Sequence, residues 1–300
     1  MDKYDVVAIG NYTKDTIVSA AGTRYVDGGG YSYAAHAACL RGLRIAAVTR
    51  LAAEDRGSTQ ALSARGVDVH VIESPSSTLM RLEYPTDDVD LRILTVAAVA
   101  EPFEPAQLAP FEARAFIVNG SVRGEASLEV MQALRNKGGL LAADVQGFVR
   151  VVAEDGRLRY EAWPEQAEVL ALLDVVKTDA VEAEFLTGES DIRAAAAALA
   201  AYGPPEIVLT HKDGVLVLAQ EKYFEAGFHP RELKGRSGRG DTCLGSYVSC
   251  RIDASPAAAT AWAAAVTSLK LVHAGPVQNT RAEAEALVAA RYAGLASQGN

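Results

Sequence analysis

Short apolar runs, separated by longer helix-forming segments, set the pattern of this chain. The apolar runs are rich in β-branched residues and end at glycine or polar residues, so they predict buried strands. The strands are predicted at 4–9, 16–20, 44–50, 67–72, 115–118, 140–145 and 174–177, and the helices at 31–40, 58–65, 105–114, 125–136, 164–172 and 194–201. This alternation predicts an α/β fold with a mostly parallel central sheet flanked by helices.

Two stretches break the alternation. Leu79–Tyr84 and Val89–Leu94 flank Pro85–Asp88, a combination that predicts a β-hairpin. Such an insertion can serve as a lid or a dimer contact, and a plain surface excursion is an equal alternative. Further on, the sequence predicts antiparallel strands at 207–210, 215–218 and 222–226, then helices at 241–252, 256–272 and 281–292. We expect one domain over residues 1–300, with a small lid from about 12–27 and 78–99.

Composition narrows the class of protein. Three hundred residues, 49% of them hydrophobic, can bury one large core. The formal charge of −9 disfavours nucleic acid and anionic membranes as partners. Cys39, Cys243 and Cys250 form no paired framework, and neither a signal peptide nor a membrane-spanning run is apparent. We therefore expect a reduced, cytoplasmic setting.

The stretch Gly238–Asp241, with the sequence Gly-Arg-Gly-Asp, is the strongest candidate for chemistry. It leads from a polar loop into an apolar helix, and its glycines let consecutive N–H groups approach a ligand. The helix N-terminus adds unpaired donors and a positive dipole, so the segment predicts an anion site. A carboxylate there suggests general-base work on a hydroxyl that faces a phosphoryl group. That Asp241 or Thr242 merely caps the helix is equally compatible with this segment alone.

Further polar residues follow the predicted strands. In open parallel sheets, ligands bind beyond the carboxyl ends of the strands. The residues predicted at those ends are Asn11, Asp15, Asp144, Lys177, Asp179 and Thr210, together with the loops that lead to Gly28 and Gly238. Their convergence favours the catalytic interpretation of Asp241.

Three motifs together resemble the ribokinase-like (PfkB) carbohydrate kinases, and the resemblance covers essentially the whole chain. Gly238–Asp241 resembles the family's Gly-Ala-Gly-Asp signature, Lys177–Glu184 its Lys-Pro-Asn-x-x-Glu segment, and Asp27–Gly30 its N-terminal Gly-Gly signature. The resemblance implies a three-layer fold with a small β lid. It also implies ATP-dependent transfer of the γ-phosphoryl group to a hydroxyl of a small polyol, sugar or nucleoside. Mg²⁺ is the implied cofactor, and a requirement for a monovalent cation is left open.

The resemblance also implies roles for individual residues. Asp241 would be the base, the amides of Gly238, Arg239 and Gly240 would form an anion hole, and Glu182 would organise Mg²⁺ through water. The implied nucleotide-binding residues are Lys177, Asp179, Thr210, Lys212 and Gly214, and the implied acceptor-binding residues are Asn11, Asp15, Gly28, Gly29, Gly30, Tyr33, Asp144 and Gln146. A homodimer through the lid is a further expectation.

Some positions depart from the family pattern. Arg239 replaces alanine and adds a cation where the γ-phosphate should lie, for which a surface salt bridge is the alternative role. Tyr33 stands where many sugar-binding members have asparagine, and Asp144–Arg150 matches Asp-x-Asn-x-x-x-Arg only loosely. Tyr33, Gln146 and Arg239 favour an inositol-kinase-like branch. A nucleoside kinase and a non-catalytic nucleotide- or sugar-binding regulator are alternatives, whereas the incomplete Gly-x-Gly-x-x-Gly fingerprint disfavours an oxidoreductase.

Overall fold

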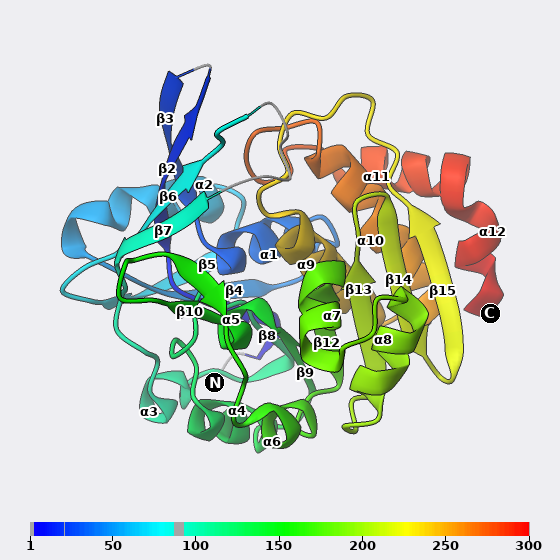
Figure 1. The fold of residues 1–300 in the computed structure, drawn as a ribbon. Helices are drawn as coiled ribbons and strands as arrows, with labels where there is room; N and C mark the ends of the chain where they lie inside the picture. The colour runs from blue at the N-terminus through cyan, green and yellow to red at the C-terminus, as the bar shows by residue number, and fades with distance from the viewer. Residues whose placement is uncertain (1–2, 21, 87–92, 300) are drawn as a thin grey trace.

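A large, mostly parallel sheet forms the centre of the computed structural model, which describes residues 3–20, 22–86 and 93–299 (Figure 1). Its strands, in spatial order, are β15 (Lys222–Gly227), β14 (Gly214–Ala219), β13 (Glu206–Thr210), β12 (Val175–Asp179), β9 (Leu140–Asp144), β8 (Ala113–Val118), β1 (Tyr4–Ile9), β4 (Ile45–Leu51) and β5 (Asp68–Glu73). The pairings from β13 to β5 are parallel, and β13, β14 and β15 pair antiparallel. The predicted α/β class and the antiparallel end of the sheet are confirmed.

The sheet is buried on both faces because its strands carry apolar residues on both. In β1, Val6 and Ala8 pack into the cluster formed with α1 (Gly30–Cys39), α9 (Arg239–Arg251) and α10 (Pro256–Lys270). Their neighbours Val7 and Ile9 pack into the opposite cluster, which contains residues of α4 (Leu128–Arg135). Since successive side chains of a strand point to opposite faces, this arrangement gives three layers.

The remaining helices differ in length from several predictions. They are α2 (Gln60–Ser63), α3 (Pro105–Leu108), α5 (Gln146–Val149), α6 (Gln166–Leu170), α7 (Ala180–Thr187), α8 (Ile192–Ala200), α11 (Arg281–Leu287) and α12 (Ala293–Ala296). The helix predicted at 105–114 is wrong beyond residue 108. Its last residues join β8, which pairs with β1 from Ala113 opposite Tyr4, so tertiary pairing overrides the local preference. The helix predicted at 281–292 continues after α11 only as a π-helical turn, Val288–Tyr292.

A second sheet projects from the body of the molecule (Figure 1). It has the order β3 (Gly22–Gly28), β2 (Thr13–Ser19), β6 (Thr78–Glu83) and β7 (Ile93–Ala98). The first arm of the predicted hairpin is confirmed by β6. The second arm was predicted at 89–94, which lies mainly outside the described residues, and the observed strand extends to Ala98. Strand β3, and the short hairpin of β10 (Arg150–Val152) and β11 (Leu158–Tyr160), were not predicted.

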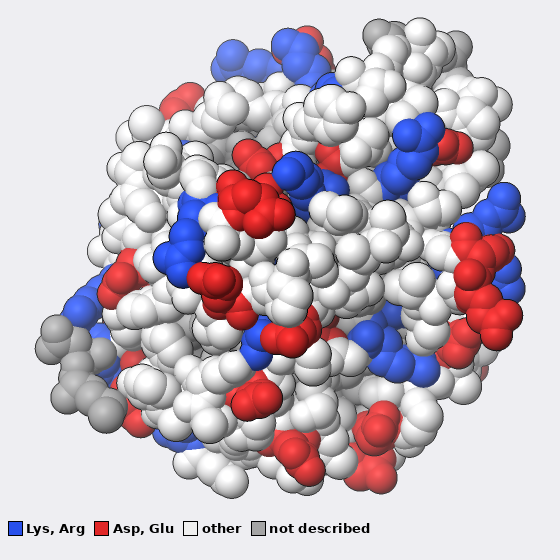
Figure 2. All heavy atoms as spheres, turned by 90° about the vertical axis from the view of Figure 1, so that its left-hand side faces the viewer, with Lys and Arg blue, Asp and Glu red and all other residues white. Residues whose placement is uncertain are grey.

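The surface around the second sheet carries charges of both signs. Acidic and basic side chains are interspersed across the face shown in Figure 2, as is usual for a solvated surface. In the part of the chain that the structure describes, no helix has the length and apolar character needed to cross a membrane.

Candidate active site

Helix α9 begins at Arg239, directly after Gly238, which is in the left-handed region with φ of 76°. A Cβ atom at residue 238 would lie 2.2 Å from a carbon of the Tyr33 ring, so both conformation and space require glycine here. Asp241 is the third residue of the helix, and the N-cap position is occupied by Gly238. The interpretation of Asp241 or Thr242 as the N-cap is therefore wrong.

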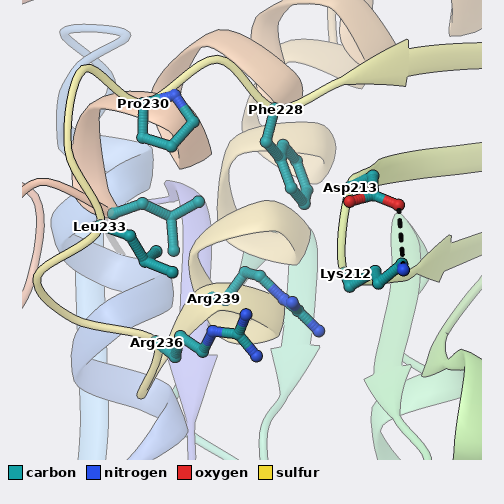
Figure 3. A pocket seen from close by; sticks show the side chains of 8 residues that line it. Lys212, Asp213, Phe228, Pro230, Leu233, Arg236 and Arg239 are labelled. Carbon is teal, nitrogen blue, oxygen red and sulfur yellow. Dashed lines mark ion pairs between the residues drawn. The ribbon is translucent and has the colours of Figure 1, made fainter. Parts of the chain in front are cut away.

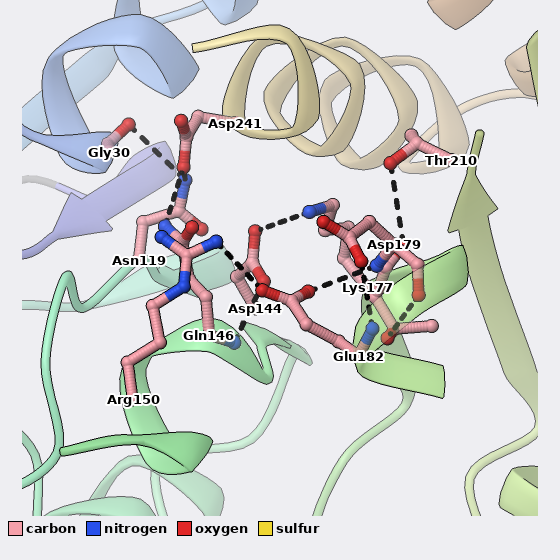
Figure 4. Close-up of polar contacts among 11 residues, drawn as sticks. Gly30, Asn119, Asp144, Gln146, Arg150, Lys177, Asp179, Glu182, Thr210 and Asp241 are labelled. Atoms are coloured by element: carbon pink, nitrogen blue, oxygen red, sulfur yellow. Dashed lines mark hydrogen bonds and ion pairs between the residues drawn. The ribbon is translucent and has the colours of Figure 1, made fainter. Parts of the chain in front are cut away.

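The Asp241 carboxylate is held by two side-chain amides. Asn119 Nδ2 and Gln146 Nε2 each donate a hydrogen bond to Asp241 Oδ1 at 3.1 Å (Figure 4). Burial raises the pKa of Asp241, while the positive charges of Lys177 and Arg150 oppose that rise. The site thus fixes one oxygen of the carboxylate and makes the group more basic than an exposed aspartate.

Glycine also allows the N-terminus of α1 to approach Asp241. A Cβ atom at Gly30 would lie 2.6 Å from Asp241 Oδ1, and Asn119 Nδ2 donates to the Gly30 carbonyl at 3.2 Å. Gly29, with φ of 105°, is the N-cap of α1, and a Cβ atom there would lie 2.6 Å from the Asn11 carbonyl oxygen. The N-terminal ends of α1 and α9 therefore meet at the same carboxylate.

A buried ion pair lies beneath the start of α9. Lys177 Nζ is 2.9 Å from Asp144 Oδ2, and Asp144 Oδ1 accepts the backbone N–H of Gln146 at 3.1 Å. A Cβ atom at Gly240 would lie 2.3 Å from Lys177 Nζ, so the ammonium touches the backbone of the predicted anion hole. Burial lowers the pKa of Lys177, but the surrounding carboxylates, first Asp144 and then Glu182, Asp179 and Asp241, together outweigh burial. The pKa is therefore raised and the ammonium stays charged.

Glu182 belongs to the same cluster. Arg150 Nη2 donates to its Oε1 at 2.8 Å, and the backbone N–H of Asp179 donates to its Oε2 at 3.0 Å. Asp179 in turn accepts the backbone N–H of Glu182, so the two residues form the capping box of α7. Glu182 lies in the same polar cluster as Asp144 and Asp241 (Figure 4).

The fit of these residues to Mg²⁺ is poor as they stand. The side chain of Glu182 is fully buried, and both of its oxygens already accept hydrogen bonds. Among the described residues no group of three or more His, Cys, Asp or Glu side chains could hold a metal ion. The assignment of Glu182 to Mg²⁺ therefore stays a prediction, and the chemistry proposed below uses the protein's own groups.

A cationic cavity of about 260 Å³ opens beside the start of α9 (Figure 3). Lys212, Arg236 and Arg239 supply its positive charge. Asp213 contributes one negative charge, and apolar side chains from the loop after β15, together with Leu271, complete the wall. Arg239 projects from the first residue of α9 into this space, so cations and helix N–H groups face one cavity.

Three predicted acceptor residues come from β2, the loop before it and α1. Asp15 on β2 is so close to β3 that a Cβ atom at Gly28 would lie 2.7 Å from its Oδ2. Asn11 is buried, and its Nδ2 donates toward the carbonyls of Ala100 and Glu101 at 3.5 and 3.4 Å. Tyr33 is 5% exposed and packs against Gly238. Their contact with an acceptor stays a prediction.

Two predicted nucleotide residues have evident local roles. Thr210 ends β13, and its hydroxyl donates to the Thr178 carbonyl at 3.4 Å. Gly214 begins β14, and a Cβ atom there would lie 2.4 Å from the Ala226 carbonyl oxygen of β15. Strand packing alone explains this glycine.

Three residues of the site, Asn119, Lys270 and Glu125, were not predicted, and Arg150 was named only as the end of a loosely matching segment. Asn119 follows β8 directly, and a search of every strand end would have found it. Arg150 and Lys270 contact the site only through tertiary packing. The buried carboxylate of Glu125 accepts the backbone N–H groups of Asn11, Ser121 and Val122 at 3.0, 2.8 and 3.1 Å, which joins the loops after β1 and β8.

A mostly parallel sheet with two helix N-termini that meet at an aspartate of raised pKa is an arrangement suited to phosphoryl transfer. The chain belongs to the pfkB family of carbohydrate kinases, whose model matches residues 4–282. It is therefore a phosphotransferase that acts on hydroxyl groups of sugars. A search among curated proteins gave no match.

Solved structures of this family resemble the chain along most of its length. A pyrophosphate-dependent kinase of the ribokinase family, in complex with a pyrophosphate analogue and myo-inositol, is 34% identical with a TM-score of 0.86, over 94% of this chain and 99% of that one. A pyrophosphate-dependent myo-inositol-1 kinase, converted by mutation into a myo-inositol-3 kinase, is 34% identical with a TM-score of 0.87, over 96% and 99%. The ribokinase of Arabidopsis thaliana with ribose and ATP shares the fold, at 18% identity and a TM-score of 0.77, over 96% and 99%.

Proposed function

We propose that this protein phosphorylates a hydroxyl of a cyclic polyol of the myo-inositol kind, with Asp241 as the general base. The observation that carries the proposal is the position of Asp241, whose Oδ1 is fixed by Asn119 and Gln146 between the ends of two helices. The kinship to myo-inositol kinases at 34% identity supports this class of acceptor.

The proposed step needs only groups that lie at the start of α9. Because both amides donate to Oδ1, we assign Oδ2 of Asp241 to accept the proton of the acceptor hydroxyl. The hydroxyl oxygen forms a bond to the terminal phosphorus of the donor, and the bridging P–O bond breaks toward the leaving phosphate. The amides of Gly238–Asp241 and the Arg239 guanidinium stabilise the charge on the transferring group.

Pyrophosphate is the donor that we favour, and ATP, the donor implied by the sequence resemblance, is the second candidate. The cavity at Arg239 measures about 260 Å³, below the roughly 300–1,000 Å³ of typical sites for drug-sized ligands. It carries three cationic side chains, Lys212, Arg236 and Arg239, which suit a compact polyanion. Two relatives at 34% identity are pyrophosphate-dependent, which supports the same choice.

We further propose that the second sheet is a lid over the acceptor. Asp15 of β2 and Gly28 of β3 place it next to the glycines at the start of α1. Its exposed apolar side chains include Tyr25 at 76% and Ile93 at 37% exposure, which suit contact with a second subunit. A concentration-dependent change in mass by sedimentation would support the dimer, and a monomer at all concentrations would refute it.

A two-way screen tests the function. The purified protein is incubated with Mg²⁺ and either pyrophosphate or ATP, against myo-inositol, ribose, fructose and a nucleoside, and products are followed by ³¹P NMR. We expect a phosphomonoester with myo-inositol and pyrophosphate. Transfer from ATP alone would overturn the donor assignment, transfer to the nucleoside alone would overturn the acceptor, and transfer in no combination would favour a non-catalytic regulator.

A further inference from the structure

Lys270 is a buried cation that the proposed phosphoryl transfer does not use. It is the last residue of α10, it is 0% exposed, and its Nζ donates a hydrogen bond to the Gly235 carbonyl at 2.7 Å. Among the described residues no carboxylate forms a salt bridge with it. Burying an ammonium without a paired carboxylate is costly, so its presence calls for an explanation.

The carbonyl that Lys270 binds belongs to the loop that leads into α9. The backbone N–H groups of Lys234 and Gly235 both donate to the Leu271 carbonyl, at 2.9 and 3.2 Å. A Cβ atom at Gly235 would lie 2.1 Å from the His273 carbonyl oxygen. The C-terminal end of α10 therefore holds this loop at Gly235, three residues before Gly238, through the Lys270 ammonium and through backbone hydrogen bonds.

Lys270 also lies close to Tyr33 of α1. Its Nζ lies 5.5 Å from the centre of the Tyr33 ring, a distance at which the face of an aromatic ring attracts a cation. The same ring lies against Gly238, where a Cβ atom would be 2.2 Å from it. One ammonium thus contacts both the loop and the ring that together fix the backbone of Gly238.

We propose, on the basis of the proposed function, that Lys270 is a positioning residue whose ammonium serves as a built-in monovalent cation for the anion hole. A bound K⁺ would stabilise such a loop by coordinating a main-chain carbonyl, and the ammonium does the same by donating to Gly235. Its unit charge, held beside Gly235 and Tyr33, also adds to the positive potential at the start of α9, where the amides would receive the phosphoryl group. Turnover by this protein should therefore need no added K⁺.

The charge on Lys270 makes this role sensitive to pH. Burial lowers the pKa of Lys270 to about 8, the Asp241 carboxylate opposes that shift, and the Arg239 guanidinium adds to it. Tyr33, which faces the ammonium from α1, stays neutral in this range because burial raises its own pKa. The ammonium is charged below about pH 8 and loses its proton above it, so the turnover number should fall at alkaline pH.

The test compares Lys270→Met with the wild-type protein and with Lys222→Met, which removes an exposed lysine of β15. Turnover number and KM are measured from pH 6.5 to 9.5, with Na⁺ or K⁺ as the only added monovalent cation. We expect Lys270→Met to lower the turnover number about 10- to 100-fold, the range for one hydrogen bond to a charged group, and to abolish the alkaline fall. The KM for the polyol should stay unchanged, and K⁺ or methylammonium should restore part of the lost turnover.

Two outcomes overturn the proposal. One is a wild-type protein that requires K⁺, and the other is a Lys270→Met variant with the wild-type rate and the same alkaline fall. If Lys270→Met does not fold, two measurements on the wild type still test the proposal: whether turnover requires K⁺, and whether it falls at alkaline pH. Lys270→Arg gives a third test, because its turnover number should not fall at high pH. If the wild type shows no turnover, the proposed function fails by itself. Calorimetric binding of pyrophosphate at pH 7 and 9.5 then tests Lys270, and equal affinities would refute its role.

Discussion

The surroundings of Asp241 and the cavity at Arg239 lie side by side at the start of α9, yet they are built differently. Asn119, Asp144 and Glu182 are fully buried. Each makes short polar contacts that hold its side chain in a single conformation. In the cavity, by contrast, the side chain of Lys212 is 77% exposed and pairs only loosely with Asp213 at 4.0 Å. Long side chains in contact with solvent keep much of their conformational freedom.

This difference separates the two tasks of a phosphoryl-transfer site. A general base must be held within a few tenths of an ångström, so it is fixed by packed glycines and paired amides. A polyanionic donor can be captured by flexible cations that adjust to it. Substitutions near Asp241 should therefore change the turnover number, whereas substitutions in the cavity should change the affinity for the donor and the choice between donors.

The largest effect is expected from Asp241→Asn. The amide cannot accept the acceptor proton, so the turnover number should fall about 10²–10⁴-fold, with little change in the binding of pyrophosphate. Steady-state kinetics and calorimetry measure the two quantities. Asp155→Asn is the matched control because Asp155 is a surface residue paired with Arg159. A variant with loss of donor binding but a normal turnover number would place Asp241 in the donor site.

Arg239→Ala should have the next largest effect, on the donor. Loss of one charge-assisted contact should raise the KM for pyrophosphate about 10- to 100-fold and leave the KM for the polyol unchanged. The turnover number should also fall, because Arg239 is proposed to stabilise the charge on the transferring group. Arg193→Ala, which removes an exposed arginine that pairs with Glu225, is the control. Kinetics that match those of the wild type would assign Arg239 to a surface salt bridge.

A smaller effect is expected from Gln146→Leu, because Asn119 still holds Asp241. We expect the turnover number to fall about tenfold, the equivalent of one hydrogen bond of about 1.4 kcal/mol. Loss of an amide donor should also raise the pKa of Asp241, so the acidic limb of the pH–rate profile should move to higher pH. Gln132→Leu on the exposed side of α4 is the control, and an unmoved acidic limb would contradict the orienting role.

Local pattern predicted the fold and the ends of the strands, because both depend on apolar runs and turn residues. It located Asp144 correctly at the end of β9. Lys177, predicted as the end of its strand, is instead the middle residue of β12, where it pairs with Asp144 in the sheet and forms an ion pair with it. It missed β3, because the sequence of this strand contains two glycines and charged residues. The segment is a strand because it pairs with β2 along its whole length. The role of Lys270 could not be predicted from the local sequence, because it depends on contacts with Gly235 and Tyr33, which are distant from it in the sequence.

The smallest effect on turnover, and a clear effect on stability, is expected from Glu125→Gln. Burial raises the pKa of Glu125 to about 7, and the backbone N–H groups of Asn11, Ser121 and Val122 oppose that rise. In the unfolded chain the group titrates near 4.3, so between about pH 4.5 and 7 the folded state holds a proton that the unfolded state has lost. The stability that Glu125 contributes is present below this window and falls by about 3 kcal/mol as the pH rises through it.

Glutamine does not titrate, so the variant should lack this part of the pH dependence. Urea unfolding at pH 5 and pH 7.5 measures it, with Glu129→Gln on the exposed side of α4 as the control. Turnover near neutral pH should change less than threefold, a difference of under about 0.7 kcal/mol, because Glu125 joins the loops behind Asn11 without contacting Asp241. Equal pH dependence of stability in wild type and variant would show that the three N–H groups keep Glu125 ionised, since donors to a carboxylate favour its charged form.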